Sequence, residues 1–142
     1  MSEPTEPQSI TGGCLCGAVR FSIRGRLPGV GMCHCSKCRR VSGVASNANL
    51  NVRKDRLTWL AGEDNLQTFS LPSGWTTVFC RTCGCPAPHP TPDGERVWAP
   101  AGSLDADPGP RVAGHIMVGS KASWDVIGDD GPQFNEYPPS NA

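Results

Sequence analysis

The chain has 142 residues and a formal net charge of zero, with 17 glycines, 14 prolines and 8 cysteines. This length suits one domain with its own core and is too short for two ordinary domains. The many glycines and prolines favour turns and short strands, which excludes a helical bundle. The neutral total charge indicates neither a nucleic-acid partner nor a membrane partner.

The charges are unevenly distributed along the chain. Up to Arg56 there are nine Lys and Arg against three Asp and Glu, and beyond it there are four against ten. The first part is therefore basic, and it contains a stretch with three closely spaced cysteines. A basic surface there suits an anionic ligand, although a solvated surface of mixed charge fits the same count equally well.

Both ends of the chain are predicted to be tails. Residues 1–10 are polar, mildly acidic and contain two prolines, so we expect a flexible tail and neither a signal nor a transit peptide. A single domain is expected over residues 11–137, with a C-terminal tail over 138–142. No apolar run approaches the roughly 20 residues that a membrane span needs. We therefore expect a cytoplasmic protein, in which clustered cysteines bind metal or react more often than they pair.

Apolar and polar residues alternate in several short segments, as in half-buried strands. Val19, Phe21 and Ile23 alternate with polar residues, which predicts a strand over 18–24. A short extended piece is expected over 29–32, and further strands are predicted, in chain order, over 44–52, 57–60, 66–71, 75–79, 96–99 and 114–118. The strands over 66–71 and 75–79 are expected to form a hairpin that leads into Cys80.

Other segments between the strands have their own signals. Ser36 is expected to cap a helical turn over 36–41, which Gly43 ends. Residues 86–92 have a proline at every second position, so they cannot form a central strand and are expected on the surface. Residues 121–127 are expected to form one helical turn or an extended arm.

The cysteines fall into three groups, Cys14-x-Cys16, Cys33-x-Cys35-x-x-Cys38 and Cys80-x-x-Cys83-x-Cys85. Disulfides are the alternative to metal sites. However, cysteines two positions apart do not easily reach unstrained disulfide geometry, and the cysteine content is below that of disulfide scaffolds. The spacing instead predicts zinc sites.

The pair Cys80 and Cys83 has the form of a zinc knuckle, because the glycine that follows can take the positive φ needed after the second thiolate. Zinc prefers four ligands, and Cys14 and Cys16 are the natural complement. Such a site would be closed and structural, and it would tie the first strand to the hairpin. Other partitions stay open, because Cys85 can complete the other site or remain free.

Cys33, Cys35 and Cys38 are then left for a second ion. Three thiolates leave a tetrahedral ion one ligand short, and the open position is where a substrate can bind. His34 lies between two of these ligands. Its side chain is therefore expected to point away from the metal, and a role as general base is the alternative.

Taken together, these motifs resemble the glutathione-dependent formaldehyde-activating enzyme family, which also contains centromere protein V-type proteins. The resemblance extends from about residue 12 to residue 134. The matching motifs are residues 13–21, 33–39, 79–84, 101–105, 115–116 and 120–124. The chain departs from the family pattern at Cys85, which here precedes a proline-rich segment containing His89. If Cys85 completes the second zinc site, that site is closed.

The resemblance implies a mainly β protein, with a β-tent fold of small antiparallel sheets stapled by zinc. It implies two Zn2+ ions per chain. The structural ion would be held by Cys14, Cys16, Cys80 and Cys83, and the functional, more labile ion by Cys33, Cys35 and Cys38.

The activity implied is that of a carbon–sulfur lyase, similar to S-(hydroxymethyl)glutathione synthase, which joins or cleaves a thiol such as glutathione and formaldehyde or a related aldehyde. Zinc with an open position can lower the pKa of the bound thiol. Lys37, Arg39 and Arg40 are candidates to hold its carboxylates, Trp124 is a candidate to line the pocket, and His115 is expected to be structural. The alternative is a non-catalytic zinc-binding module that binds or carries a thiol ligand or a protein partner.

Overall fold

The computed structural model describes residues 8–139, which form three small β-sheets, one short α-helix and four 3-10 turns. The prediction of a mainly β protein built of small antiparallel sheets is confirmed. Residues 1–7 of the predicted N-terminal tail and residues 140–142 of the predicted C-terminal tail lie outside the described residues. No helix within residues 8–139 is long and apolar enough to cross a membrane.

The first sheet is antiparallel and has the strand order β1-β2-β5. Its strands are β1 (Ser9–Gly13), β2 (Arg20–Arg24) and β5 (Leu57–Ala61). The predicted alternation is confirmed in β2 and the residue before it, where Val19, Phe21 and Ile23 are buried. β1 was not predicted, and it takes Ser9 and Ile10 out of the expected tail. Its sequence alternates no apolar residues, so it gives no periodic signal.

The second sheet has five strands in the order β10-β3-β4-β9-β8. They are β3 (Val30–Cys33), β4 (Asn47–Arg53), β8 (His89–Pro90), β9 (Arg96–Pro100) and β10 (Val112–Ile116). Three of the pairings are antiparallel, but β10 and β3 run parallel, with an irregularity between Val112 and Gly114. This pairing places His115 opposite Met32 and Ile116 opposite Cys33.

The third sheet is the predicted hairpin of β6 (Leu66–Ser70) and β7 (Thr76–Cys80). The helix is α1 (Ser36–Ser42), and the 3-10 turns are η1 (Lys54–Arg56), η2 (Glu63–Asn65), η3 (Ala101–Ser103) and η4 (Val118–Ser120). Gly43 ends α1 in a left-handed conformation, as predicted, but the N-cap is Cys35 and not Ser36. The Cys35 sulfur accepts a hydrogen bond from the Cys38 amide at 3.3 Å, which is the hydrogen bond that an N-cap side chain makes.

The proline-rich segment after Cys85 is only partly on the surface: Pro86, Pro90 and Pro92 are exposed, whereas Ala87 and Pro88 are buried. Ala87 is only 2% exposed, Pro88 is fully buried, and the Ala87 amide donates to the Val78 carbonyl at 2.9 Å. The prolines are tolerated because β8 lies at the edge of its sheet, where a missing N–H leaves no ladder partner unsatisfied.

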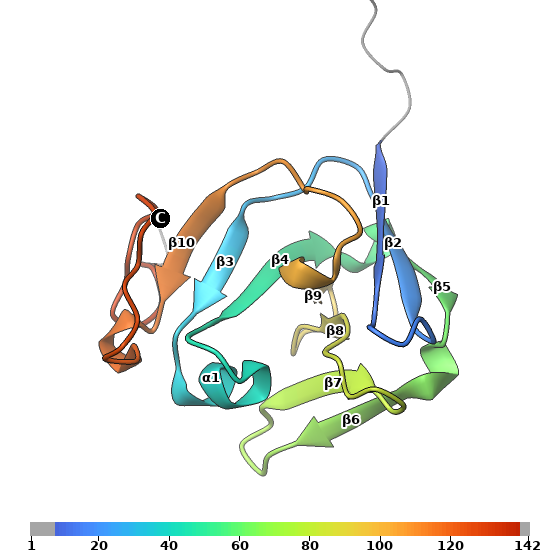
Figure 1. Cartoon of the computed structure of the whole chain (residues 1–142), viewed down its shortest axis with the longest axis horizontal. Coiled ribbons are helices and arrows are strands. Elements are labelled where there is room, and N and C mark those ends of the chain that lie inside the picture. Colours follow the sequence, from blue (N-terminus) through green and yellow to red (C-terminus); the bar gives the residue numbers. More distant parts are fainter. Residues whose placement is uncertain (1–7, 140–142) are drawn as a thin grey trace, which may run out of the picture.

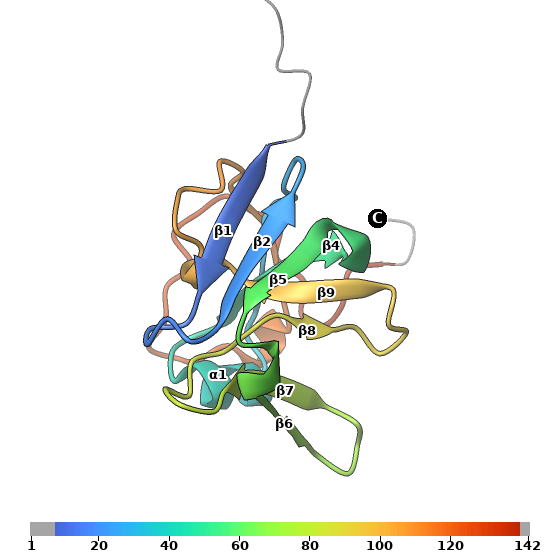
Figure 2. The ribbon, with the colours of Figure 1, turned by 90° about the vertical axis from the view of Figure 1, so that its right-hand side faces the viewer.

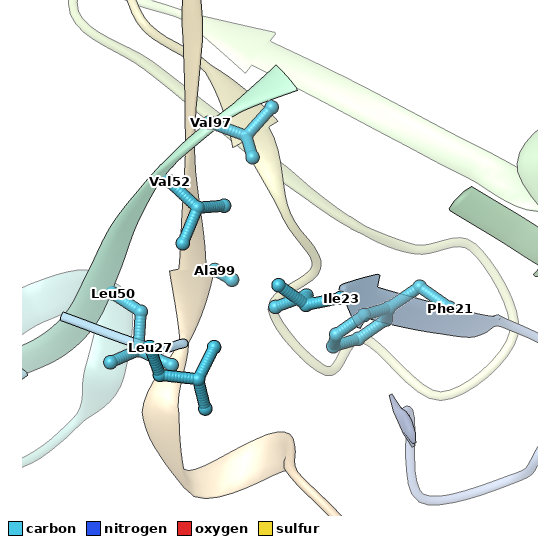
Figure 3. Close-up of a cluster of buried hydrophobic side chains, with 7 residues drawn as sticks. All are labelled: Phe21, Ile23, Leu27, Leu50, Val52, Val97 and Ala99. Atoms are coloured by element: carbon cyan, nitrogen blue, oxygen red, sulfur yellow. The ribbon is translucent and has the colours of Figure 1, made fainter. Parts of the chain in front are cut away.

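The main core lies where the first sheet meets the five-stranded sheet. Figure 1 shows β1, β2 and β5 on one side, β3 and β10 on the other and β4 and β9 between them, with the β6–β7 hairpin and α1 at the base. Figure 2 shows the hairpin and α1 at the base from a second side. Side chains from β2, β4 and β9 meet between the two sheets (Figure 3), and the cluster consists of Phe21, Ile23, Leu27, Leu50, Val52, Val97 and Ala99. Trp59 packs on it, edge-on to the Phe21 ring at a centroid distance of 6.3 Å.

Ile23→Ala is expected to lower the free energy of unfolding by about 3 kcal/mol, because it removes a fully buried side chain from this cluster and leaves a cavity. Denaturant unfolding of the metal-loaded protein measures the change. Val126→Ala is the control, since this side chain is 87% exposed, and it should change stability little. Equal effects of the two substitutions would contradict the assignment of Ile23 to the core.

Candidate functional site

Four cysteines meet between the first sheet and the hairpin. Cys14 and Cys16 lie in the turn from β1 to β2, Cys80 ends β7, and Cys83 lies in the turn that follows. Their sulfurs all lie within 4.8 Å of one another. The Cys14 and Cys16 sulfurs are 3.6 Å apart, and those of Cys16 and Cys80 are 3.8 Å apart. A tetrahedral ion with metal–sulfur bonds of about 2.3 Å separates its sulfurs by about 3.8 Å, so this group fits one ion.

Backbone amides and a side-chain amide prepare these sulfurs for a cation. The Val19 amide donates to the Cys14 sulfur at 3.2 Å, and the Asn65 side-chain amide donates to the Cys80 sulfur at 3.4 Å. Hydrogen bonds from the backbone of Cys16 lower the pKa of Cys83 to about 5. Such donors favour the thiolate, which is the form that binds metal.

The turn after Cys80 has the geometry of the predicted knuckle. Gly84 has a φ of 77°, and its amide donates to the Cys80 carbonyl at 2.8 Å. The Cys80 amide in turn donates to the Cys85 carbonyl at 2.9 Å. A residue with a Cβ atom is disfavoured at this φ, which explains the glycine that the sequence has directly after the second cysteine.

Three further cysteines meet where β3 leads into α1. Cys33 ends β3, Cys35 caps the helix and Cys38 lies in its first turn, and their sulfurs lie within 4.8 Å of one another. The Cys38 thiol donates to Cys33 and lowers the pKa of Cys33 to about 6, while the same hydrogen bond and burial raise the pKa of Cys38. These shifts favour the thiolate form of Cys33, which is the form that binds metal. The group can hold a metal ion with three sulfurs.

Cys85 belongs to neither group. It lies beside the four-cysteine group, where the Leu15 backbone and the Cys83 thiol are its hydrogen-bond neighbours. Within residues 8–139, the cysteines that share a site with Cys33 are Cys35 and Cys38 alone. The structure therefore does not bring Cys85 to the three-cysteine group, and the alternative in which it closes that site has no geometric basis.

His34 turns its side chain away from the cysteines, as predicted. The ring is 1% exposed, and its Nε2 atom lies 2.8 Å from Nδ1 of His115, itself 2% exposed. His115 Nε2 faces the Asp129 carboxylate at 2.9 Å, and His34 Nδ1 lies 3.9 Å from an oxygen of Asp125. Sequence reasoning missed both carboxylates, because they are 14 or more positions from their partners and carry no local signal.

A groove runs along α1 beside the three-cysteine group. Arg39, Arg40 and Trp124 come together in it, as the sequence suggested, with Ser36, Gly43 and Val44 completing the lining. Lys37 is exposed on the same helix but does not line the groove.

The guanidinium groups in this groove carry positive charge that the protein does not neutralise. The Nε atom of Arg39 is buried and has no hydrogen-bond partner. Within residues 8–139, no ion pair involves Arg39 or Arg40. Positive charge that no carboxylate of the described residues pairs makes the groove suited to an anionic group.

Comparison with known proteins bears on this site. The chain is similar to a protein from Rhodobacter sphaeroides known from a crystal structure, with 28% sequence identity and a TM-score of 0.57, over 68% of this chain and 88% of that one. A comparison with curated proteins found no match. The sequence model of the family described as glutathione-dependent formaldehyde-activating enzyme matches residues 9–120 and so includes all eight cysteines. The chain therefore belongs to the glutathione-dependent formaldehyde-activating enzyme family.

Proposed function

We propose that the protein is a zinc-dependent carbon–sulfur lyase that joins, or cleaves, a thiol such as glutathione and formaldehyde or a related aldehyde. One observation carries the proposal: within residues 8–139, three cysteine sulfurs converge without a fourth ligand, beside a groove with unpaired guanidinium groups. Family membership supports the same activity. Because all eight cysteines are free thiols, we place the protein in a reducing compartment, the cytoplasm.

The donor sets point to zinc, because soft thiolates in groups of three and four suit this ion. The four-cysteine group would hold a closed, structural ion. Cys33, Cys35 and Cys38 would hold the second ion, which, when bound, supplies the Lewis acidity that lowers the pKa of an incoming thiol. Bond formation then joins the thiol sulfur to the aldehyde carbon. The thiol proton leaves the sulfur and the carbonyl oxygen gains one, so the product is an S-hydroxymethyl thioether.

The groove residues would bind and orient the thiol. Glutathione carries two carboxylates, and the guanidinium forks of Arg39 and Arg40 suit bidentate carboxylate binding. Lys37, exposed one position before the buried Cys38, adds positive charge at the helix. Trp124 offers a flat apolar surface to the peptide stem. His34 has no part in this binding, because its ring is directed into the interior towards His115.

Adduct formation by the zinc-loaded protein should exceed the uncatalysed rate, since thiols add to formaldehyde without help. Cys35→Ser is expected to abolish the excess rate, because it removes one of three metal ligands. The adduct is followed by NMR or mass spectrometry, and Cys85→Ser is the control because Cys85 lies outside both metal groups. If no thiol and aldehyde pair reacts above background with the wild type, the lyase is excluded and the non-catalytic module that carries a thiol or a protein partner takes its place.

Metal analysis should find two zinc ions per chain, of which a mild chelator removes only one. Cys83→Ser is expected to lower the content by one ion and to destabilise the fold, because it opens the site that ties the first sheet to the hairpin. Cys85→Ser should leave both ions in place. Two ions that both resist the chelator would argue against an open site and for the non-catalytic module.

Arg39→Ala is expected to raise KM for glutathione about tenfold, because it removes one charge-assisted hydrogen bond to a carboxylate. KM for 2-mercaptoethanol, a thiol without carboxylates, should not change. Arg24→Ala, which removes the same charge from an exposed position in β2, is the matched control. A rise in KM that is equal for both thiols would refute carboxylate binding by Arg39.

A further inference from the structure

The chain beyond β10 forms a loop whose two ends are attached to that strand. It leaves at Met117, which has a positive φ of 58°, and the returning segment donates and accepts backbone hydrogen bonds at β10. The His115 amide donates to the Pro132 carbonyl at 2.8 Å, and the Phe134 amide donates to the His115 carbonyl at 2.9 Å. Figure 1 shows this red segment folding back beside β10. We call residues 117–131 the C-terminal loop.

Two carboxylates of this loop, those of Asp129 and Asp125, approach the buried rings of His115 and His34. The carboxylate of Asp129 faces His115 Nε2 with both oxygens, at 2.9 and 3.1 Å. Because a carboxylate only accepts, Nε2 must donate, and in the neutral ring Nδ1 of His115 then accepts from His34 Nε2. His34 Nδ1 is left as an acceptor, 3.9 Å from Asp125, which cannot donate either. This agrees with the buried Nδ1 atom that has no partner.

The hydrogen bond from His115 to Asp129 attaches the loop to β10 through side chains. If the loop shifts, the buried His115 ring loses this partner, which is costly. Apolar side chains stay in contact when they slide past one another, whereas a hydrogen bond is lost when its donor and acceptor no longer align. The His34 amide, which donates to the Ile116 carbonyl at 3.0 Å, fixes the same histidine to β10 on the backbone side.

The other side of the loop reaches the arginine groove. Trp124 lines the groove although it is 70% exposed. It lies in a turn closed by the Asp125 amide, which donates to the Ala122 carbonyl at 3.2 Å, and by Lys121, whose ammonium group donates to the Asp125 carbonyl at 2.6 Å. Asp125, the residue that follows Trp124, has a carboxylate oxygen 3.9 Å from His34 Nδ1 and makes no hydrogen bond with it. Trp124 thus lies in the loop that Asp129 joins to His115.

We propose that His115 and Asp129 are positioning residues for thiol binding: with His34 they hold the C-terminal loop so that Trp124 forms one wall of the groove. This inference rests on the proposed function, which assigns the groove to the thiol. Neither residue touches the thiol. Because His34 stands between two metal ligands, Cys33 and Cys35, the same contact places the groove wall relative to the three-cysteine group.

Asp129→Ala tests the inference, and the side chain is exposed enough for the variant to fold. Amide hydrogen exchange in residues 118–128 should become about tenfold faster, and the Kd for glutathione, measured by calorimetry on zinc-loaded protein, should rise by about the same factor. Asp130→Ala is the matched control, because it removes the same charge from the adjacent exposed position. Asp129→Asn should restore most of the binding, since its amide oxygen can still accept from His115.

Trp124→Ala separates positioning from simple destabilisation. It should raise the Kd for glutathione as Asp129→Ala does, and the double variant should bind no more weakly than either single variant, because both remove the same wall. Independent, multiplying effects would overturn the inference. Hydrogen exchange in Asp129→Ala equal to that in Asp130→Ala would overturn it as well.

The two proposals fail in different ways. A wild type that binds glutathione and shows these responses but no turnover would exclude the lyase and support the positioning role. Turnover in the wild type with an Asp129→Ala variant that behaves like Asp130→Ala would support the lyase and overturn the positioning role. A wild type that neither binds nor turns over any of the thiols tested would overturn both, because the groove would then have no thiol to orient.

Discussion

The four-cysteine group is the constraint on which the rest of the fold depends. It joins the β1–β2 turn of the first sheet to the end of the β6–β7 hairpin. The hairpin needs this link, because β6 is largely exposed and the hairpin strands bury only Val78 and Cys80. Apolar burial of so few side chains stabilises a two-stranded hairpin poorly. Four sulfurs close enough to share one ion can supply the link that the small core of the hairpin does not.

The two cysteine groups differ because different backbone structures present them. In the four-cysteine group, two turns face each other and supply two sulfurs each, so the ligands surround one point. In the three-cysteine group, one continuous segment from the end of β3 to the first turn of α1 supplies all three sulfurs. Ligands from one segment approach from one side only. An ion held this way would keep its opposite side for a ligand from outside the protein, and this difference underlies the proposal of one structural and one reactive site.

Local sequence signals predicted the parts of the fold that depend on neighbouring residues. The alternation of Val19, Phe21 and Ile23, the hairpin before Cys80 and the left-handed glycine after α1 follow from period-two patterning and turn chemistry. The grouping of Cys33, Cys35 and Cys38 follows from local ligand spacing. The preference of zinc for four ligands paired Cys14 and Cys16 with Cys80 and Cys83 across the chain, and the family resemblance implied the same four.

Features that depend on distant contacts were not predicted, for identifiable reasons. The parallel pairing of β10 with β3 is set by the sheet as a whole, and nothing in either strand encodes it. Ala87 and Pro88 are buried against β7, where the Ala87 amide donates to the Val78 carbonyl, a tertiary effect that overrides the usual exposure of proline-rich segments. Cys35 caps α1 because its sulfur accepts from the Cys38 amide, which no preference for Ser at N-caps indicates. Asp129 meets His115 only because the C-terminal loop returns to β10.

His34 shows how one short turn serves the metal site and the groove together. Successive side chains in an extended backbone point to opposite faces, so a backbone that directs Cys33 and Cys35 towards one point directs His34 the other way. The ring then lies under the C-terminal loop, where His115 is its partner. The spacing of the ligands thus determines where the loop is anchored. Loop residues that do not contact the histidines, such as Trp124, can be substituted and so alter what the groove binds. Such substitutions leave the three cysteines in place.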